Sequence, residues 1–305
     1  MKFRQFLSIY GRTISLVAAL AAGILLPEAA AFSAAVPYLI IIMLFFAFVG
    51  VKISLKSFRV SMLLLLAANL AVGFLGYLIL LPFNRSLALV AFMTGITPSA
   101  TASPVITGFL GGKVEYTAAV MLLTNVTVAL ILPAALPAVL GAAVTVSTWD
   151  VLKSVLVMVF IPFLLSRLIT LLPKRQFDFF VRVKPFSFGV WIVGLVLITA
   201  RASAFIRADK SVSPHMLIAV ALTSLTLCAV NFSLGWLIGR PAHAREGSQS
   251  LGQKNTTLTL WLSLAFINPL VAMGPAFYIL YHNLWNSIQL YQVNRKGSVR
   301  KIVGK

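Results

Sequence analysis

Hydrophobic positions in this chain form long continuous blocks, which short polar stretches separate. A helix needs about 20 apolar residues to cross a bilayer, and most of the blocks approach that length. The blocks do not alternate apolar and polar positions, as the strands of a membrane β-barrel would. They occupy residues 13–32, 34–51, 60–81, 87–110, 116–143, 151–172, 186–200, 216–239 and 251–293.

The last block is too long for a single crossing. Asn268-Pro269 and Gly274-Pro275 interrupt it, and proline removes a backbone donor from a helix, so we interpret 251–293 as two crossings. The sequence therefore predicts an all-α polytopic membrane protein with ten transmembrane helices. Only 10% of the 305 residues are charged and the mean hydropathy is +0.99, which excludes an ordinary soluble domain, since such a domain carries about 25% charged residues.

The net charge of +19 follows the expected topology. If the N-terminus is cytoplasmic, 19 of the 25 basic residues lie on the cytoplasmic side, five lie on the other side, and one, Lys254, falls within an expected helix. The charge therefore indicates a multi-pass protein of the inner (plasma) membrane with both termini in the cytoplasm, and it does not indicate nucleic-acid binding. The first 31 residues also have the layout of a secretory signal peptide, whose cleavage would leave nine crossings.

Ten helices divide into two halves of five, at residues 1–145 and 146–305. Because each half has an odd number of crossings, the second half enters the membrane from the opposite side. This is the inverted-repeat plan of many secondary transporters. That plan predicts interrupted helices at matching places, here the fourth and the ninth. Residues 95–104 hold two prolines among small and polar residues, and 248–257 form a second polar cluster. The alternatives are a packed proline kink in the first and, in the second, a cytoplasmic cap with the membrane beginning at Leu258.

At Thr101-Ala102-Ser103-Pro104, Gly111-Gly112 and Gly252 to Thr256, the chain resembles the bile acid:sodium symporter family. The resemblance implies a panel domain of helices one, two, six and seven and a core domain of helices three to five and eight to ten. The fourth and ninth helices would break and cross in the core. Members of the family take up organic anions together with sodium.

The sodium-binding motifs of the family are altered in this sequence. Where the family has Thr-Ala-Ser-Asn, Ser103 matches and Pro104 replaces the asparagine. Where it has Glu-Thr-Gly-Xaa-Gln-Asn, Ser250 replaces the glutamate and Lys254 the glutamine. A degenerate sodium site would remain at Ser103, Thr117 and Ser250. All six acids are placed outside the cores of the expected helices, at Glu28, Glu115, Asp150, Asp178, Asp209 and Glu246, so no buried carboxylate is expected.

These substitutions suggest that the Lys254 ammonium takes the place of a sodium ion, braces the crossing and attracts an anionic substrate. An ionisable residue inside a membrane is a functional candidate by default, although a lysine near a helix end can also extend to the interface. The candidate substrate- and ion-binding residues are Asn69, Thr101, Ser103, Pro104, Thr117, Asn125, Ser250, Gln253, Lys254, Asn255 and Thr256. Asn125 is also explained by a hydrogen bond between helices.

The sequence thus favours a secondary transporter of a small organic anion, working by alternating access within the lipid bilayer and without a cofactor. Sodium independence is the first expectation, sodium symport with degenerate sites the alternative, and proton release from Lys254 a further possibility for coupling. A membrane hydrolase with a Ser103–Lys254 dyad is the alternative from another class, and an enzyme is not expected. The identity of the anion, the direction of transport, the coupling ion and the oligomeric state stay open.

Overall fold

The computed structural model describes residues 14–15, 17–50, 59–100, 102–141, 148–208 and 213–303, and helices dominate throughout. A helix covers residues 17–25, and a 3-10 helix, η1, follows it. This 3-10 helix spans Pro27–Ala35. The elements after it are α2 (Val36–Phe48), α3 (Val60–Leu80), α4 (Arg85–Ile96), α5 (Ser103–Phe109), α6 (Val114–Leu140), α7 (Thr148–Val155), the π-helical η4 (Leu156–Phe160), α8 (Ile161–Ile169), α9 (Lys174–Val183), α10 (Phe186–Ala208), α11 (Pro214–Gly239), α12 (Ala244–Gly252), α13 (Thr256–Phe266) and α14 (Pro269–Val303).

Five stretches of helix among the described residues are long and apolar enough to cross a membrane. They are Pro27–Phe46, Val60–Leu80, Val114–Leu140, Phe186–Phe205 and Pro214–Gly239. Two shorter apolar helices, α4 and α13, are each one part of an interrupted segment. The all-helical membrane fold is therefore confirmed.

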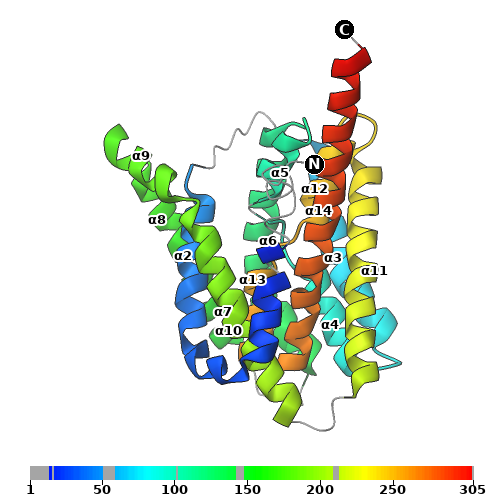
Figure 1. The fold of residues 1–305 in the computed structure, drawn as a ribbon. Coiled ribbons are helices and arrows are strands. Elements are labelled where there is room, and N and C mark those ends of the chain that lie inside the picture. Colours follow the sequence, from blue (N-terminus) through cyan, green and yellow to red (C-terminus); the bar gives the residue numbers. More distant parts are fainter. Residues whose placement is uncertain are drawn as a thin grey trace.

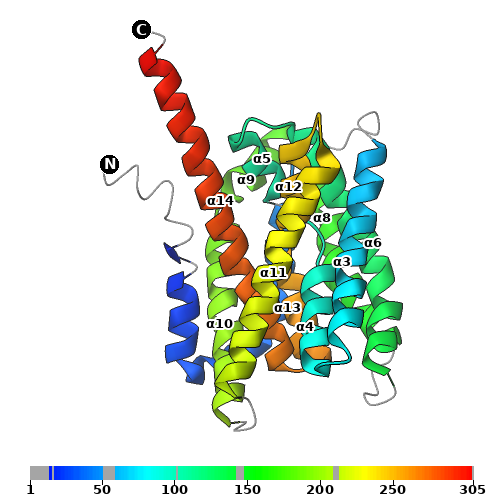
Figure 2. The same ribbon diagram turned by 90° about the vertical axis from the view of Figure 1, so that its right-hand side faces the viewer.

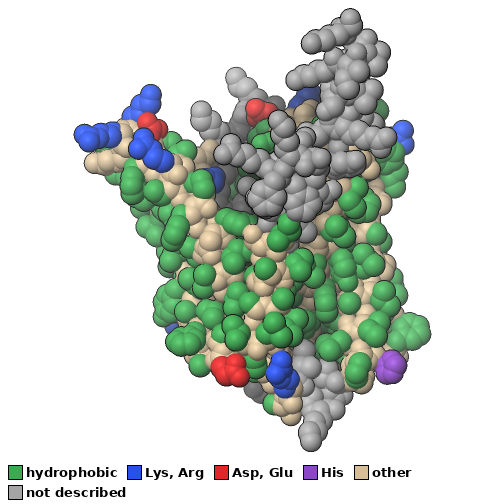
Figure 3. Space-filling view, in the orientation of Figure 1, with side chains coloured by type: hydrophobic (Ala, Val, Ile, Leu, Met, Phe, Trp, Pro, Cys, Tyr) green, Lys and Arg blue, Asp and Glu red, His purple; other side chains and the backbone are tan. Residues whose placement is uncertain are grey.

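The helices stand side by side, and α14 runs past the end of its neighbours (Figures 1 and 2). With 35 residues, α14 has a length of about 52 Å, which exceeds the roughly 30 Å hydrocarbon core of a bilayer. Hydrophobic side chains cover the visible flank of the molecule, and charged side chains gather mainly at its two ends (Figure 3). Leu75, Leu130 and Leu222 are among the large apolar side chains that are more than half exposed, as expected of a surface that faces lipid.

Both expected helix breaks are confirmed. The first interrupted segment leaves helical geometry after Ile96 and regains it at Ser103, whereas the second leaves it after Gly252 and regains it at Thr256. The expected start of the second segment, at residue 251, is wrong, because α12 already begins at Ala244. Its side chains are mostly polar, yet Glu246 to Gly252 are all buried by the surrounding helices. A search for apolar blocks therefore misses α12.

Close glycine contacts join the first half of each interrupted segment to the helix before it. A Cβ on Gly95 of α4 would lie 2.7 Å from the Cα of Gly73 of α3. In the second half of the chain, a Cβ on Gly235 of α11 would collide with the carbonyl oxygen of Gly247 of α12. Only glycine permits such approaches of two helix backbones, so the α3–α4 and α11–α12 pairs are packed by the same device.

Candidate functional site

The break after α4 leaves carbonyl groups that need partners from elsewhere. The last four carbonyls of a helix have no partner within it, and Pro98 contributes no N–H group. The Thr97 hydroxyl donates to the Met93 oxygen at 2.7 Å, and the Asn69 amide donates to the Ile96 oxygen at 3.1 Å. The Gly95 oxygen accepts from the ammonium of Lys254 at 2.9 Å. Three elements thus supply donors to the end of α4.

The two breaks cross in an antiparallel arrangement, with Ser99 opposite Lys254. The Ala100 N–H donates to the Gln253 oxygen at 2.8 Å, and the Asn255 N–H donates to the Pro98 oxygen at 2.7 Å. Backbone groups freed from the helices therefore satisfy one another, as non-helical backbone at membrane depth must. The expected crossing of the interrupted segments is confirmed by these bonds.

Lys254 is buried at the centre of this crossing, with 1% of its surface exposed. Its Nζ donates to the Asn69 Oδ1 at 2.5 Å as well as to the Gly95 oxygen. The carbonyl end of α4 carries the negative end of the helix dipole, which stabilises a cation there. The alternative of a lysine extended to the interface is wrong, because the ammonium turns inward to two oxygen ligands from α3 and α4.

Helix α6 holds the other side of the crossing. The Ser99 N–H donates to the Thr124 hydroxyl at 3.1 Å, and the Asn125 amide donates to the Ser99 oxygen at 2.8 Å. The Asn125 Oδ1 accepts from the Asn255 amide at 3.3 Å. Asn125 therefore bonds to both extended segments. Neither Ser99 nor the Gly95 carbonyl was among the sequence candidates, because backbone groups give no signal in a residue pattern.

The hydroxyls of the degenerate sodium motif lie on three helices that pack together, α5, α6 and α12. Ser103 and Ser250 are buried, and their Oγ atoms have no hydrogen-bond partner. The Thr117 hydroxyl donates to the Val114 oxygen of its own helix at 3.0 Å. Pro104 is buried in the first turn of α5 and brings no oxygen side chain. The side chains of Ser103, Thr117 and Ser250 offer only hydroxyl groups, with no amide or carboxylate. This donor set therefore fits a sodium ion poorly.

The remaining candidates have separate positions. Gln253 is buried with its Oε1 unpaired, and Thr256 begins α13 and accepts a hydrogen bond from the Thr259 hydroxyl through its carbonyl oxygen. Thr101 lies outside the described residues. Since the Ser103 Oγ has no partner, the Ser103–Lys254 dyad that a hydrolase requires is not formed.

One acid is buried, contrary to expectation. Glu246, in the first turn of α12, is 6% exposed, and its Oε1 accepts from the Lys113 N–H at 2.7 Å. The neighbouring Arg245 donates to the Leu110 oxygen at 2.8 Å. The expectation failed because Glu246 was assigned to the loop before the ninth helix. These two contacts tie the α5–α6 connection to the start of α12.

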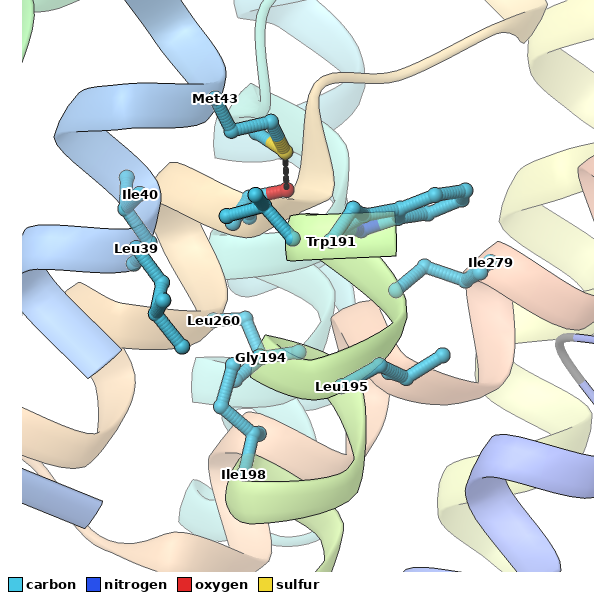
Figure 4. Close-up of a pocket in the computed structure, with 11 residues that line it drawn as sticks. Leu39, Ile40, Met43, Trp191, Gly194, Leu195, Ile198, Leu260 and Ile279 are labelled. Atoms are coloured by element: carbon cyan, nitrogen blue, oxygen red, sulfur yellow. Dashed lines mark hydrogen bonds between the residues drawn. The ribbon is translucent and has the colours of Figure 1, made fainter. Parts of the chain in front are cut away.

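Two apolar pockets flank the crossing. One lies among α2, α10, α13 and α14, and Leu39, Trp191 and Ile279 are among the side chains that surround it (Figure 4). The Thr257 hydroxyl also lines this pocket and contacts the Met43 sulfur at 3.9 Å. The other lies among α2, α6, η4 and α8, where Phe48, Phe160 and Phe163 face Asn125. The walls of both pockets are therefore almost entirely apolar, and the amide of Asn125 is engaged at the crossing.

The sequence of this chain is similar to those of known proteins. Residues 36–209 match the model of the sodium bile acid symporter family. The chain is also 26% identical over 215 residues to the uncharacterized protein YbaS of Bacillus subtilis (strain 168), covering 67% of this chain and 69% of that protein. The family match extends over more than half of the 305 residues, across both the α4–α5 break and the first helices of the second half. The chain belongs to the sodium bile acid symporter family.

Proposed function

We propose that this protein is a secondary active transporter that moves a small organic anion across the membrane by alternating access. The crossing of the two interrupted segments, with a buried ammonium at its centre, carries this proposal. Such breaks are costly in a membrane, and in many secondary transporters discontinuous helices form the substrate site. Membership of a family of transporters supports the same conclusion.

The proposed architecture has ten transmembrane segments in two inverted repeats, at residues 1–145 and 146–305. Segments four and nine are α4–α5 and α12–α13. The matching glycine contacts of α3–α4 and α11–α12 support an internal repeat, as does the antiparallel pairing of Ser99 with Lys254. We assign α2, α8 and α10, with the helix at 17–25, to a panel domain and the remaining crossings to a core domain. The basic residues favour cytoplasmic termini and an inner (plasma) membrane location.

The Lys254 ammonium acts as a fixed cation in this proposal. An amide oxygen and a backbone carbonyl are hard ligands of the kind that bind sodium, and here a lysine nitrogen occupies the space between them. A sodium ion beside this ammonium would be repelled. Transport would therefore not require sodium, whereas a sodium-coupled mechanism would have to use the hydroxyls of Ser103, Thr117 and Ser250.

The substrate would bind between the two domains, against the crossing. The pocket that contains Asn125 supports this position, because its walls come from α2, η4 and α8 on one side and α6 on the other. The charge of Lys254 lies at the centre of the crossing and is turned toward α3 and α4, so it would favour an anion through space rather than by direct contact.

Uptake into proteoliposomes tests the proposal. A panel of radiolabelled organic anions is offered with an inward sodium gradient, with an inward proton gradient, or with neither, and protein-free liposomes serve as the blank. We expect uptake of at least one anion that does not depend on sodium, and a loss of at least tenfold in the Lys254→Ala variant. Unchanged uptake in that variant would refute the role of Lys254, and strict sodium dependence of the wild type would favour the sodium-coupled alternative.

The Asn125→Ala variant tests the position of the substrate site. It removes the hydrogen bonds that join Asn125 to Ser99 and to Asn255 at the crossing beside this pocket, and we expect a several-fold rise in KM for the anion. Asn283→Ala is the matched control, because the Asn283 amide donates to the Ile279 oxygen within its own helix. An equal effect of both substitutions on KM would contradict the assignment.

A further inference from the structure

Helix α9 separates charged and apolar side chains into two faces. At 100° per residue, its charged side chains share one arc and its apolar side chains fill the opposite one. The charged arc consists of Lys174, Arg175, Asp178 and Arg182, and the apolar side consists of Phe177, Phe179, Phe180, Val181 and Val183. No residue of α9 is buried, so packing within the protein does not account for this pattern.

The position of α9 places it at a membrane boundary. It connects α8 to α10, and it projects from the body of the molecule beyond the ends of those helices (Figure 1). On this arm the charged side chains lie at the outer end, and hydrophobic side chains cover the part below them (Figure 3). In the proposed architecture the chain leaves the bilayer after α8 and re-enters it at α10, and the 16 residues between Ile169 and Phe186 keep α9 close to the lipid headgroups.

Only part of the apolar side of α9 packs against another helix of the protein. The Phe180 ring contacts the Phe45 ring of α2 edge to face, with centroids 5.9 Å apart. Phe179 stays 57% exposed and Val181 42% exposed. An aqueous position for these side chains would be unfavourable, whereas the acyl-chain boundary of a bilayer accepts them.

The nearby basic residues Arg167 and Lys184 already bind to the protein. Arg167 donates to the Phe48 oxygen and Lys184 to the Val49 oxygen, each at 2.8 Å, so both cap the end of α2. Among the described residues near the end of α2, the remaining positive charge lies on α9, whose three basic residues outnumber its one acid.

We propose that α9 lies in the headgroup layer and binds anionic phospholipid through Lys174, Arg175 and Arg182. A bilayer with anionic headgroups supplies both surfaces that the helix requires, an apolar one for Phe179 and a negative one for the basic arc. The contact between Phe180 and Phe45 transmits this attachment to α2. The lipid thereby holds the body of α2, α8 and α10 in place, and this inference does not depend on what the protein transports.

Thermal unfolding of the purified full-length protein in mixed micelles tests the inference. Phosphatidylglycerol or phosphatidylcholine is titrated into the micelles, and the rise in Tm gives an apparent affinity for each lipid. We expect phosphatidylglycerol to stabilise the wild type at lower concentration than phosphatidylcholine does. The double variant Lys174→Gln/Arg175→Gln should need about 25-fold more phosphatidylglycerol, since each basic residue near an anionic surface contributes about fivefold.

A matched variant separates specific binding from a general charge effect. Lys153→Gln/Arg201→Gln also removes two positive charges, from exposed side chains of α7 and α10, and it should respond to phosphatidylglycerol as the wild type does. Equal Tm values of all three proteins in phosphatidylcholine show that the variants fold. The proposal is overturned if the α9 variant responds to phosphatidylglycerol as the wild type does, which is the result expected if a soluble acidic protein were the partner. It is also overturned if the matched variant loses as much apparent affinity for phosphatidylglycerol as the α9 variant.

Discussion

Replacing Lys254 with glutamine should convert the protein into one that binds sodium. The wild-type ammonium donates to the Asn69 Oδ1 at 2.5 Å and to the Gly95 oxygen at 2.9 Å. Glutamine removes the charge and brings an amide oxygen toward the same place, so three oxygen atoms become available around a space that a cation filled. Methionine at this position removes the charge without supplying an oxygen, which makes Lys254→Met the matched control.

The expected change in the free energy of unfolding on substitution of Lys254 has two opposing contributions. Each acceptor left unpaired in the buried crossing costs about 1–3 kcal/mol, while removal of a buried charge returns part of that cost. We expect Lys254→Met to lower stability by about 2–4 kcal/mol. In Lys254→Gln, a sodium Kd of about 10 mM would return about 1.6 kcal/mol at about 150 mM sodium, because a ligand that binds only the folded state stabilises it.

The assay is thermal unfolding in detergent, in sodium chloride and in N-methyl-D-glucamine chloride at equal ionic strength. Both variants should have a lower Tm than the wild type without sodium, and sodium should raise the Tm of Lys254→Gln by about 2–5 °C. The wild type and Lys254→Met should not respond. A sodium response of the wild type as large as that of Lys254→Gln, or no response in any of the three proteins, would refute the argument that the ammonium replaces the ion.

Two further predictions concern how the interrupted segments are held. Gly235→Ala should lower the Tm by at least 5 °C in thermal unfolding, because the added Cβ collides with the backbone of α12. Gly189→Ala is the control, because a Cβ added there meets nothing within 4 Å. Equal Tm changes in the two variants would contradict the argument. Glu246→Ala should cost about 1–2 kcal/mol of unfolding free energy, since it removes the acceptor of the Lys113 N–H at 2.7 Å. The exposed Glu115 changed to Ala should cost less than about 0.5 kcal/mol in the same measurement, and a larger loss there would show that charge alone is responsible.

The all-helical membrane fold and both helix breaks could be predicted from the sequence. Continuous apolar blocks specify crossings because the bilayer admits little else, and Pro98 and Pro104 stand among glycine and small polar residues, a composition that favours a break. The start of α12 and the amphipathic α9 could not be found in this way. Helix α12 is polar because protein rather than lipid surrounds it, and α9 was hidden among charges that had been assigned to topology.

Sequence alone also identified Lys254 as a residue that does not fit the distribution of charge, and it identified the missing carboxylate of the sodium motif. Only the tertiary structure decided where the ammonium lies. Its ligands, Asn69 and the Gly95 carbonyl, are 185 and 159 positions away along the chain. A backbone carbonyl becomes a ligand when its helix ends and a neighbouring segment approaches it, and that depends on packing rather than on residue type. The same packing buried Glu246, which the sequence had placed in solvent.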